Sequence, residues 1–350
     1  MGSNPQRAVR HSDVPAALRR ATLQRRNETG YLLALVAAAG LALATAPALA
    51  QPFPSKPIRI VVPYTPGGTS DILARAIGQK MTEAWGQPVV VENKPGANGN
   101  VGADLVAKAP ADGYTLLLTD IGGLCISASV YPALPFDPAR DFAPVVLISY
   151  SPHVLGVHPS VPASTVKELV ALAKSKPGGL NFATAGVGSA PHLAGVEFAL
   201  RTGVRWTYVP YKGGSAALAD VVAGHAEVLF NGMLPTYPFV TGGKLRAIAV
   251  SSAKRAAAAP HLPTVSESGL PGFETGSWQG ILAPAGTQGE IVERLNAEVQ
   301  RILALPDVQQ RLAAQGTEVR AGTPGALAAF MRAEIARWAK VVRQVGLKIE

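Results

Sequence analysis

The sequence predicts an α/β protein with two lobes, each built on a mainly parallel sheet flanked by helices. Short apolar runs alternate with helical patterns through most of the 350 residues, and this alternation indicates parallel strands joined by crossover helices. Two stretches, residues 149–157 and 277–284, are expected to be crossover strands that join the lobes twice.

The apolar spacing predicts the individual elements in order. In the first lobe we expect strands at residues 58–62, 89–91, 114–119 and 145–149, and helices at residues 69–85 and 100–108. Thr69 or Ser70 can cap the first helix, with Asp71 in its first turn. In the second lobe we expect strands at residues 180–184, 208–210, 228–231 and 245–251, and helices at residues 165–176, 190–201 and 215–223.

The first 50 residues have the pattern of a secretory signal peptide. Six arginines precede an apolar stretch that ends in Ala48-Leu49-Ala50, which predicts cleavage between Ala50 and Gln51. A membrane anchor is the alternative, since an apolar stretch of about 19 residues is just long enough to span a bilayer. The pair Arg19-Arg20 leaves both the general and the twin-arginine export routes open, and the long basic region leaves the true start codon open.

These observations divide the chain into four parts. Residues 1–50 are the predicted signal peptide, residues 51–150 the first part of lobe 1, and residues 151–277 lobe 2. Residues 278–350 are expected to supply a return strand and amphipathic C-terminal helices, at residues 290–303, 306–315 and 324–345, that pack on lobe 1.

The charge and cysteine content exclude some classes of protein. The chain has 32 Lys and Arg against 23 Asp and Glu, and without residues 1–50 the balance is 26 against 21, a net charge of +5. These charges form no basic run with interleaved aromatic residues, so we expect no nucleic-acid partner.

Cys125 is the single cysteine. In its apolar setting we expect a buried side chain rather than a reactive thiol.

Motifs typical of enzymes and metal sites are absent. The sequence contains no G-x-x-x-x-G-K-[ST], H-E-x-x-H, C-x-x-C or G-x-S-x-G, and its six histidines show no metal-ligand spacing. We therefore predict no metal and no cofactor. Asp71 and Asp220 are expected to cap or solvate helices rather than act as bases. For Trp278 and Gln279, lining a cleft and packing in the core or hinge stay open as alternatives.

Four glycine-containing turns lead from a predicted strand into a predicted helix, at residues 63–71, 93–100, 183–192 and 211–215. Free backbone N–H groups at a helix start form a site for an anion. Ligands of open α/β sheets bind at the carboxyl ends of the strands, so we expect these turns, two from each lobe, to face one cleft. Among their side chains and glycines, the candidates for ligand contact include Tyr64, Tyr211, Lys212 and Gly213.

Several ordered motifs carry a resemblance to a known family. They are residues 62–71, 91–97, 110–116, 134–142, 209–214 and 262–269; the fifth reads Val209-Pro210-Tyr211-Lys212-Gly213-Gly214. With these motifs the chain from residue 52 to residue 350 resembles the Bug-type (TctC-like) extracytoplasmic solute-binding receptors of tripartite tricarboxylate transporters.

The resemblance implies a periplasmic-binding-protein fold of type II, which closes on an organic acid like a Venus flytrap. A carboxylate is then held by main-chain amides and bridging waters. The positions that correspond in this chain are Thr65, Gly67, Gly68, Ala97 and Asn98, with Gly188, Ser189 and His192 across the cleft. For His192 a purely structural role is the alternative. The sequence departs from the family pattern at residues 121–125, and dicarboxylates, amino acids, nicotinate-like acids and aromatic acids all stay open as ligands.

The expected function is that of a monomeric periplasmic protein, not an enzyme, that captures a small carboxylate and delivers it to transporter subunits in the membrane. Two alternatives remain. One is a sensory receptor that presents its solute to a membrane signalling partner. The other is an exported enzyme in which His192 and either Asp71 or Asp220 form an acid–base pair.

Overall fold

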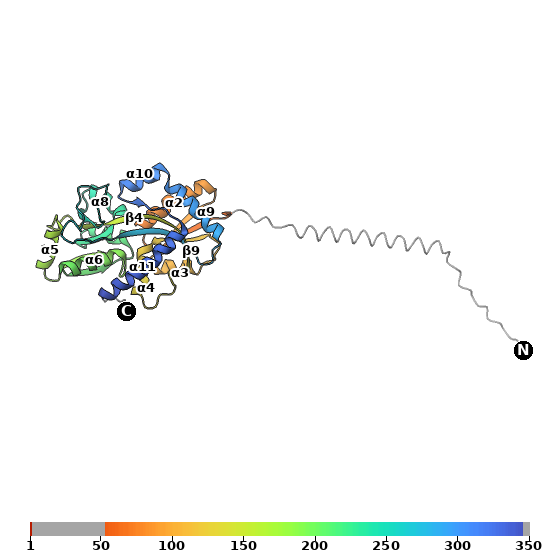
Figure 1. The fold of residues 1–350 in the computed structure, drawn as a ribbon, viewed down its shortest axis with the longest axis horizontal. Coiled ribbons are helices and arrows are strands. Elements are labelled where there is room, and N and C mark those ends of the chain that lie inside the picture. The colour runs from red at the N-terminus through yellow and green to blue at the C-terminus, as the bar shows by residue number, and fades with distance from the viewer. Residues whose placement is uncertain (2–52, 346–350) are drawn as a thin grey trace. The chain divides into compact units, whose positions relative to one another are not determined.

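One long strand, β4 (Phe142–Val157), connects the two halves of a ten-stranded sheet (Figure 1). The computed structural model describes Met1 and residues 53–345, so the predicted signal peptide and its cleavage site at Ala50 lie outside the described residues. In the described part of the chain, no helix combines the length and the apolar character that crossing a membrane requires.

The first half of the sheet has three parallel strands and one antiparallel strand beside β4. In spatial order these are β2 (Val89–Asn93), β1 (Ile58–Val62), β3 (Thr115–Asp120) and β9 (Gly276–Pro284). β9 pairs antiparallel with β3 on one side and with β4 on the other. The two-residue strand β10 (Glu318–Val319) also pairs with β4.

The second half repeats this arrangement on the other end of β4. In spatial order its strands are β7 (Val228–Gly232), β5 (Leu180–Thr184) and β6 (Trp206–Pro210), all parallel to one another, with β8 (Arg246–Val250) pairing separately with β4. The prediction of mainly parallel sheets is therefore right for the three strands on the outer side of each half. Every strand pair that includes β4 or β9 is antiparallel in the described chain, and β4 and β9 themselves run in opposite directions between the halves.

Most helices begin and end within two residues of the predicted bounds. They are α2 (Thr69–Trp85), α3 (Asn100–Ala107), α5 (Val166–Ser175), α6 (Ala190–Thr202), α7 (Gly214–Val222), α9 (Gly289–Leu303), α10 (Pro306–Ala314) and α11 (Pro324–Val345). Three described helices are not predicted, and the first is the short η1 (Ala97–Gly99). α4 (Ile121–Val130) is buried almost all round and has no polar face, and α8 (Met233–Thr241) contains two prolines.

The C-terminal helices pack on the first half of the sheet, on both of its faces (Figure 1). On one face, Leu295 and Val299 of α9 lie in one aliphatic cluster with Ile58 of β1 and Ile77 of α2. On the other face, α11 packs with α3 and α4 around Cys125, which is buried as expected. The residue bounds of the two lobes stay a prediction.

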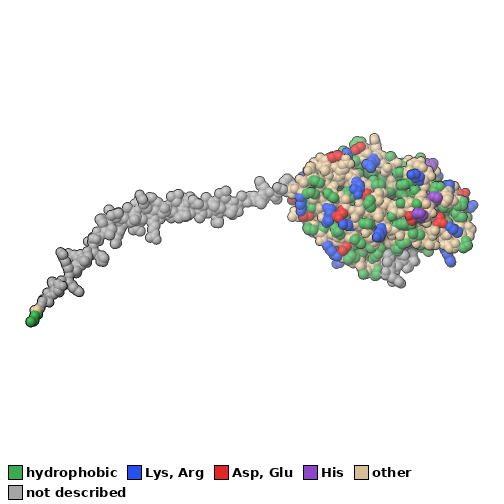
Figure 2. Space-filling view, turned by 180° about the vertical axis from the view of Figure 1, so that it is seen from behind, with side chains coloured by type: hydrophobic (Ala, Val, Ile, Leu, Met, Phe, Trp, Pro, Cys, Tyr) green, Lys and Arg blue, Asp and Glu red, His purple; other side chains and the backbone are tan. Residues whose placement is uncertain are grey.

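The core of the second half is richer in aromatic residues. Phe182, Phe198, Trp206, Phe230 and Phe273 lie together in it, with neighbouring ring centroids 5.5–6.4 Å apart. On the surface, basic and acidic side chains are interspersed over the face seen in Figure 2, as expected from the modest net charge.

Candidate ligand-binding cavity

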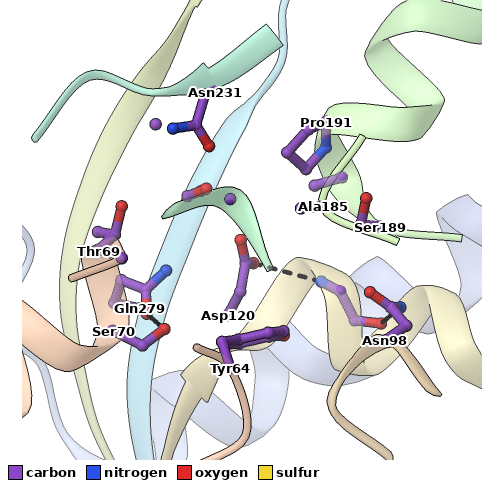
Figure 3. A pocket seen from close by; sticks show the side chains of 16 residues that line it. Tyr64, Thr69, Ser70, Asn98, Asp120, Ala185, Ser189, Pro191, Asn231 and Gln279 are labelled. Carbon is purple, nitrogen blue, oxygen red and sulfur yellow. Dashed lines mark hydrogen bonds between the residues drawn. The ribbon is translucent and has the colours of Figure 1, made fainter. Parts of the chain in front are cut away.

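A cavity lies where the carboxyl ends of two sets of three parallel strands, one set from each half of the sheet, come together (Figure 3). Its volume is about 50 Å³, which is room for a few water-sized groups. We call the residues at or after the carboxyl ends of β1, β2 and β3 the first wall: Tyr64, Gly68, Thr69, Ser70, Asn98, Asp120 and Gly123. The residues at or after the carboxyl ends of β5, β6 and β7 form the second wall: Ala185, Ser189, Ala190, Pro191, Gly214, Asn231 and Gly232. Ser277 and Gln279 of β9 complete the lining.

Helix N-termini make up most of this lining. The helices α2, α4, α6, α7 and α8 each begin at or beside a lining residue. The N-terminal end of a helix carries a partial positive charge and presents N–H groups that have no partner within the helix. Several such ends around one small cavity therefore favour an anionic group inside it.

Three of these helix ends have no side-chain cap, and each of the three follows a glycine. α2 begins after Gly68, α7 after Gly213 and α8 after Gly232, and none of these three glycines supplies a side-chain cap. In α8 the Leu234 amide donates to Ser151 Oγ of β4 at 3.4 Å. The other two ends are capped. Asp120 Oδ1 accepts from the Gly123 amide at 3.3 Å in α4, and Ser189 Oγ accepts from the His192 amide at 3.2 Å in α6.

Close approach explains two glycines of the lining. A Cβ atom at Gly214 would lie 2.2 Å from Asn231 Oδ1, and one at Gly232 would lie 2.7 Å from Thr69 Oγ1. A side chain at either position would displace a polar lining residue. Glycine therefore keeps the uncapped amides of α7 and α8 accessible from the cavity.

Hydrogen bonds fix the polar side chains of the lining. Ser70 Oγ donates to Gln279 Oε1 at 2.6 Å, so the Gln279 Nε2 group is the end of that amide left to donate to a ligand. Asn231 Nδ2 donates to Thr236 Oγ1 at 3.0 Å. Because Thr236 Oγ1 itself donates to the Gly232 carbonyl, it can only accept from Asn231, and Asn231 Oδ1 is left as an acceptor.

The lining carries a single carboxyl group and no basic group. None of the described lining residues is Lys, Arg or His, and Asp120 is the only acidic one. Burial raises the pKa of Asp120 to about 6, although hydrogen bonds from Ser277 and from nearby backbone amides oppose this rise. Burial, together with the nearby Asp120 charge, raises the pKa of Tyr64 far above its ordinary value.

Contacts between the two walls close the cavity. Thr65 Oγ1 and Ser215 Oγ are 2.7 Å apart, and the Thr65 amide donates to the Lys212 carbonyl at 3.4 Å. On the other side, Asn98 Nδ2 donates to the Gly188 carbonyl at 3.2 Å. The structure therefore has the arrangement expected of a closed cleft.

The structure brings together part of the predicted site. Tyr64, Gly68, Asn98 and Ser189 line the cavity. Thr65 and Gly213 lie at the contact between the walls, where a Cβ atom at Gly213 would come within 2.7 Å of Thr65 Oγ1. Three further predicted residues line a neighbouring cavity of about 390 Å³ that shares Tyr64 and Asn98 with the first; they are Ala97, Tyr211 and Lys212.

The remaining predicted residues lie behind the lining. The Gly67 amide donates to Asp71 Oδ2 at 2.9 Å and so holds the first turn in place. The Gly188 amide donates to His192 Nδ1 at 3.2 Å. The His192 ring packs edge-on against Tyr208, and burial lowers its pKa to about 4. His192 therefore lies behind the lining of the cavity, and its contact with a ligand stays a prediction.

The acid–base pair considered above is not assembled. Asp71 bonds to Arg75 and Asn93, and Asp220 bonds to Tyr211 and His225, so neither carboxylate faces His192. Within the described chain, no group of three His, Cys, Asp or Glu side chains lies close enough together to hold a metal ion.

The sequence pattern does not mark Asp120 or Asn231 as ligand contacts, and it leaves the role of Gln279 open. Both missed residues are polar residues in the last two positions of a buried apolar strand, and each is followed by a helix that was not predicted. A polar residue at the end of such a strand is the signal that points to them. Gln279 lines the cavity, whereas Trp278 packs against Tyr150, with ring centroids 4.6 Å apart.

Two α/β half-sheets joined by two long strands, with a closed cavity at the strand ends, define the fold of the periplasmic binding proteins. Residues 73–347 match the family described as the tripartite tricarboxylate transporter family receptor, TctC. The chain belongs to this family, and the resemblance to Bug-type receptors is confirmed.

Individual relatives agree with this assignment. BugT of Bordetella pertussis is 36% identical over 321 residues, which cover 90% of this chain and 98% of BugT. A Rhodopseudomonas palustris protein solved with bound malate, MatC, is 35% identical, with a TM-score of 0.79 over 83% of this chain and 100% of that one. An R. palustris protein solved with adipate is 38% identical, with a TM-score of 0.82 over 85% of this chain and 100% of that one.

Proposed function

We propose that this protein binds a small organic carboxylate in the cavity between the two walls. The observation that carries the proposal is the set of three uncapped helix N-termini, at Gly68, Gly213 and Gly232, around a cavity without a lining cation. A carboxylate oxygen supplies an acceptor in place of the side-chain cap that these helix ends lack. An anion at one helix end gains about 0.3–1 kcal/mol, and up to about 2 kcal/mol where it is partly buried.

The ligands of the relatives support this proposal. Proteins 35% and 38% identical to this chain were solved with malate and with adipate, which are aliphatic dicarboxylates. We expect several helix ends and the Gln279 amide, acting together, to bind the acid with a micromolar Kd, which corresponds to roughly −8 kcal/mol.

The place and partner of this binding form the second part of the proposal. The predicted signal peptide and the family description support a periplasmic receptor that releases its ligand to membrane subunits of a tripartite tricarboxylate-type transporter. We infer that it acts as a monomer. The related structures are of solute-binding proteins, and we infer that the ligand leaves the cavity chemically unchanged.

Isothermal titration calorimetry tests the binding proposal. The protein from residue 51 onwards is titrated with aliphatic dicarboxylates, amino acids, nicotinate and benzoate. We expect at least one of these acids to bind with a micromolar or lower Kd, and mass spectrometry to recover it unaltered. The proposal is wrong if none of the acids binds. Recovery of a converted product would instead favour an enzyme.

Co-purification tests the transport proposal. A tagged receptor, loaded with the acid that binds best, is incubated with solubilised membranes of the source cells. We expect multi-spanning transporter subunits to be retained. Retention of a membrane kinase instead would favour the sensory alternative.

A further inference from the structure

Asp120 is the one residue of the cavity whose chemistry does not fit a site for a simple dicarboxylate. It is 8% exposed and stands on the first wall, at the carboxyl end of β3 (Figure 3). The other described lining side chains are neutral. A carboxylate next to an anionic ligand repels it, and a buried carboxylate without a cationic partner is costly.

The hydrogen bonds of Asp120 keep its carboxylate in place. Oδ1 accepts from the Gly123 amide, which is the bond marked by the dashed line at Asp120 in Figure 3. Ser277 donates from β9 and favours the charged form of Asp120. Ser277 Oγ is in turn 3.3 Å from His153 Nε2, while His153 Nδ1 is 3.0 Å from Thr275 Oγ1. This arrangement lets His153 donate to Ser277 and Ser277 donate to Asp120.

The titratable groups around Asp120 are uncharged near neutral pH. Burial lowers the pKa of His153, on β4, to about 3. Burial raises the pKa values of Tyr64, after β1, and of Cys125, on α4, above their ordinary values. With its own pKa at about 6, Asp120 is ionised above that pH, and none of these neighbours supplies a positive charge to balance it.

A second acceptor stands beside Asp120. Asn98 Nδ2 donates to Ser127 Oγ and to the Gly188 carbonyl, both at 3.2 Å, and this fixes the amide with its oxygen on the other side. Asn98 Oδ1 is buried and has no hydrogen-bond partner within the described chain. The Asn98 side chain is 8% exposed and lines the same cavity. Both residues are anchored on Gly123, since Asp120 accepts from its amide and Asn98 donates to its carbonyl.

Asp120 and Asn98 of the first wall therefore present acceptors where a second carboxylate of the ligand would need donors. A protonated amino group supplies donors and a positive charge together, so it satisfies Asn98 Oδ1 and balances the Asp120 carboxylate. The uncapped ends of α2, α7 and α8 remain available for the carboxylate of the same molecule.

We propose that Asp120 selects ligands that carry an ammonium group beside their carboxylate, so that the preferred substrate class of this receptor is small zwitterionic amino acids. This inference rests on the proposed function and narrows it. Asp120 is the residue that determines specificity, and the helix ends supply the binding of the carboxylate common to all acids.

Matched pairs of acids test the inference by calorimetry at pH 7.5. The probes are L-aspartate against succinate, L-glutamate against glutarate, and L-2-aminoadipate against adipate, since the two members of each pair differ only in the amino group. We expect the wild-type protein to bind the amino member of its best-bound pair at least tenfold more tightly.

Asp120→Asn is the variant that tests the role of the residue. Asparagine retains an oxygen that caps α4 but loses the charge, so we expect the amino member to lose at least tenfold in affinity and the preference within the pair to disappear. Asp112→Asn is the matched control, because it removes the same charge from an exposed ion pair with Lys56. We expect this control to leave the preference unchanged.

A pH series on the wild-type protein provides a test that needs no variant. Asp120 loses its charge as the pH falls through about 6, so we expect affinity for the amino acid to fall between pH 7.5 and pH 5. Affinity for the matched acid without an amino group is expected to hold or rise over the same range.

The outcomes separate this inference from the proposed function. If acids bind but the amino member has no advantage, or Asp120→Asn keeps the same preference, the inference is wrong and the carboxylate receptor stands. If no acid of either kind binds, the proposed function fails and the inference fails with it.

Discussion

The first wall, which follows β1, β2 and β3, and the second wall, which follows β5, β6 and β7, are built from the same structural unit, a strand that leads into a helix N-terminus. They differ in how these helix ends are capped. The capped helix of the first wall, α4, is capped by a carboxylate, Asp120, whereas that of the second wall, α6, is capped by a hydroxyl, Ser189.

One structural unit can therefore serve two purposes, the attraction of anions and the selection among them. An uncapped helix end attracts any anion, whatever the rest of the ligand is. A carboxylate cap that faces the cavity favours ligands that also carry a positive charge. The uncapped helix ends, α2 in the first wall and α7 and α8 in the second, are therefore expected to govern affinity for carboxylates in general, and Asp120 to govern the choice among them.

The largest effect on affinity is expected from Gly68→Pro in the first wall. The φ angle of Gly68 is −81°, which proline can adopt, so the substitution mainly removes one N–H group at the start of α2. Loss of a hydrogen bond to a charged group costs about 1.5–3 kcal/mol, and we expect up to about hundredfold weaker binding of every acid, measured by calorimetry.

Gly68→Ala is the control for this change. It keeps the N–H group, and the nearest atom to the added Cβ would be the Thr65 carbonyl oxygen at 3.7 Å, an ordinary contact. Equal affinities of the proline and alanine variants would show that this helix end does not contact the ligand.

Gly214→Ala in the second wall is expected to have the next largest effect. Its Cβ would overlap Asn231 Oδ1 at 2.2 Å, and overpacking of this kind costs about 1–3 kcal/mol. We expect roughly tenfold to thirtyfold weaker binding, with the preference within each matched pair unchanged. Gly289→Ala, where no atom lies within 4 Å of the added Cβ, is the control. A change of preference in Gly214→Ala would contradict the division of roles between the uncapped helix ends and Asp120.

Ser189→Ala is expected to weaken binding about tenfold, the effect of roughly 1.4 kcal/mol from a hydrogen bond to a charged group. The loss of its helix cap also lowers the free energy of unfolding by about 1 kcal/mol. Thr165→Ala removes an equivalent cap from α5, where Thr165 Oγ1 accepts from the Glu168 amide at 3.2 Å. If thermal unfolding shows similar destabilisation in both variants but affinity falls only in Ser189→Ala, Ser189 contacts the ligand.

The smallest effect is expected from Thr65→Val at the contact between the walls. This change removes the hydroxyl that is 2.7 Å from Ser215 Oγ but leaves the shape of the side chain. A partly exposed hydrogen bond contributes about 0.5–1.5 kcal/mol, so we expect a few-fold faster dissociation, measured by stopped-flow fluorescence. Combining Thr65→Val with Ser215→Ala should add little, whereas additive effects would show that the two hydroxyls act separately.

Much of the fold could be predicted because local signals and tertiary packing agree. The helix Thr69–Trp85 has its predicted bounds because a glycine turn precedes it and a left-handed Gly86 ends it. The amphipathic spacing of Pro324–Val345 marked that helix equally well.

The cavity residues that the sequence pattern does not mark lie just before two helices that lack such signals. Ile121–Val130 is buried on nearly every side, so it has no periodic pattern, and Met233–Thr241 contains Pro235 and Pro238. Asp120 and Asn231 come just before these helices, and with the helices unrecognised nothing marked their side chains as lining a cavity. The contact between Thr65 and Ser215 joins residues 150 positions apart, a separation that no local pattern can reveal.

The uncapped helix N-termini also affect how the affinity for a carboxylate depends on ionic strength. Exposed ion pairs weaken as ionic strength rises, because mobile ions screen charges more than about 8–10 Å apart. Here the charge that holds a carboxylate belongs to backbone dipoles at Gly68, Gly213 and Gly232, which surround a small closed cavity. Screening ions have little room beside a ligand in that cavity. A carboxylate held in this way is expected to bind with nearly the same affinity at low and at high ionic strength.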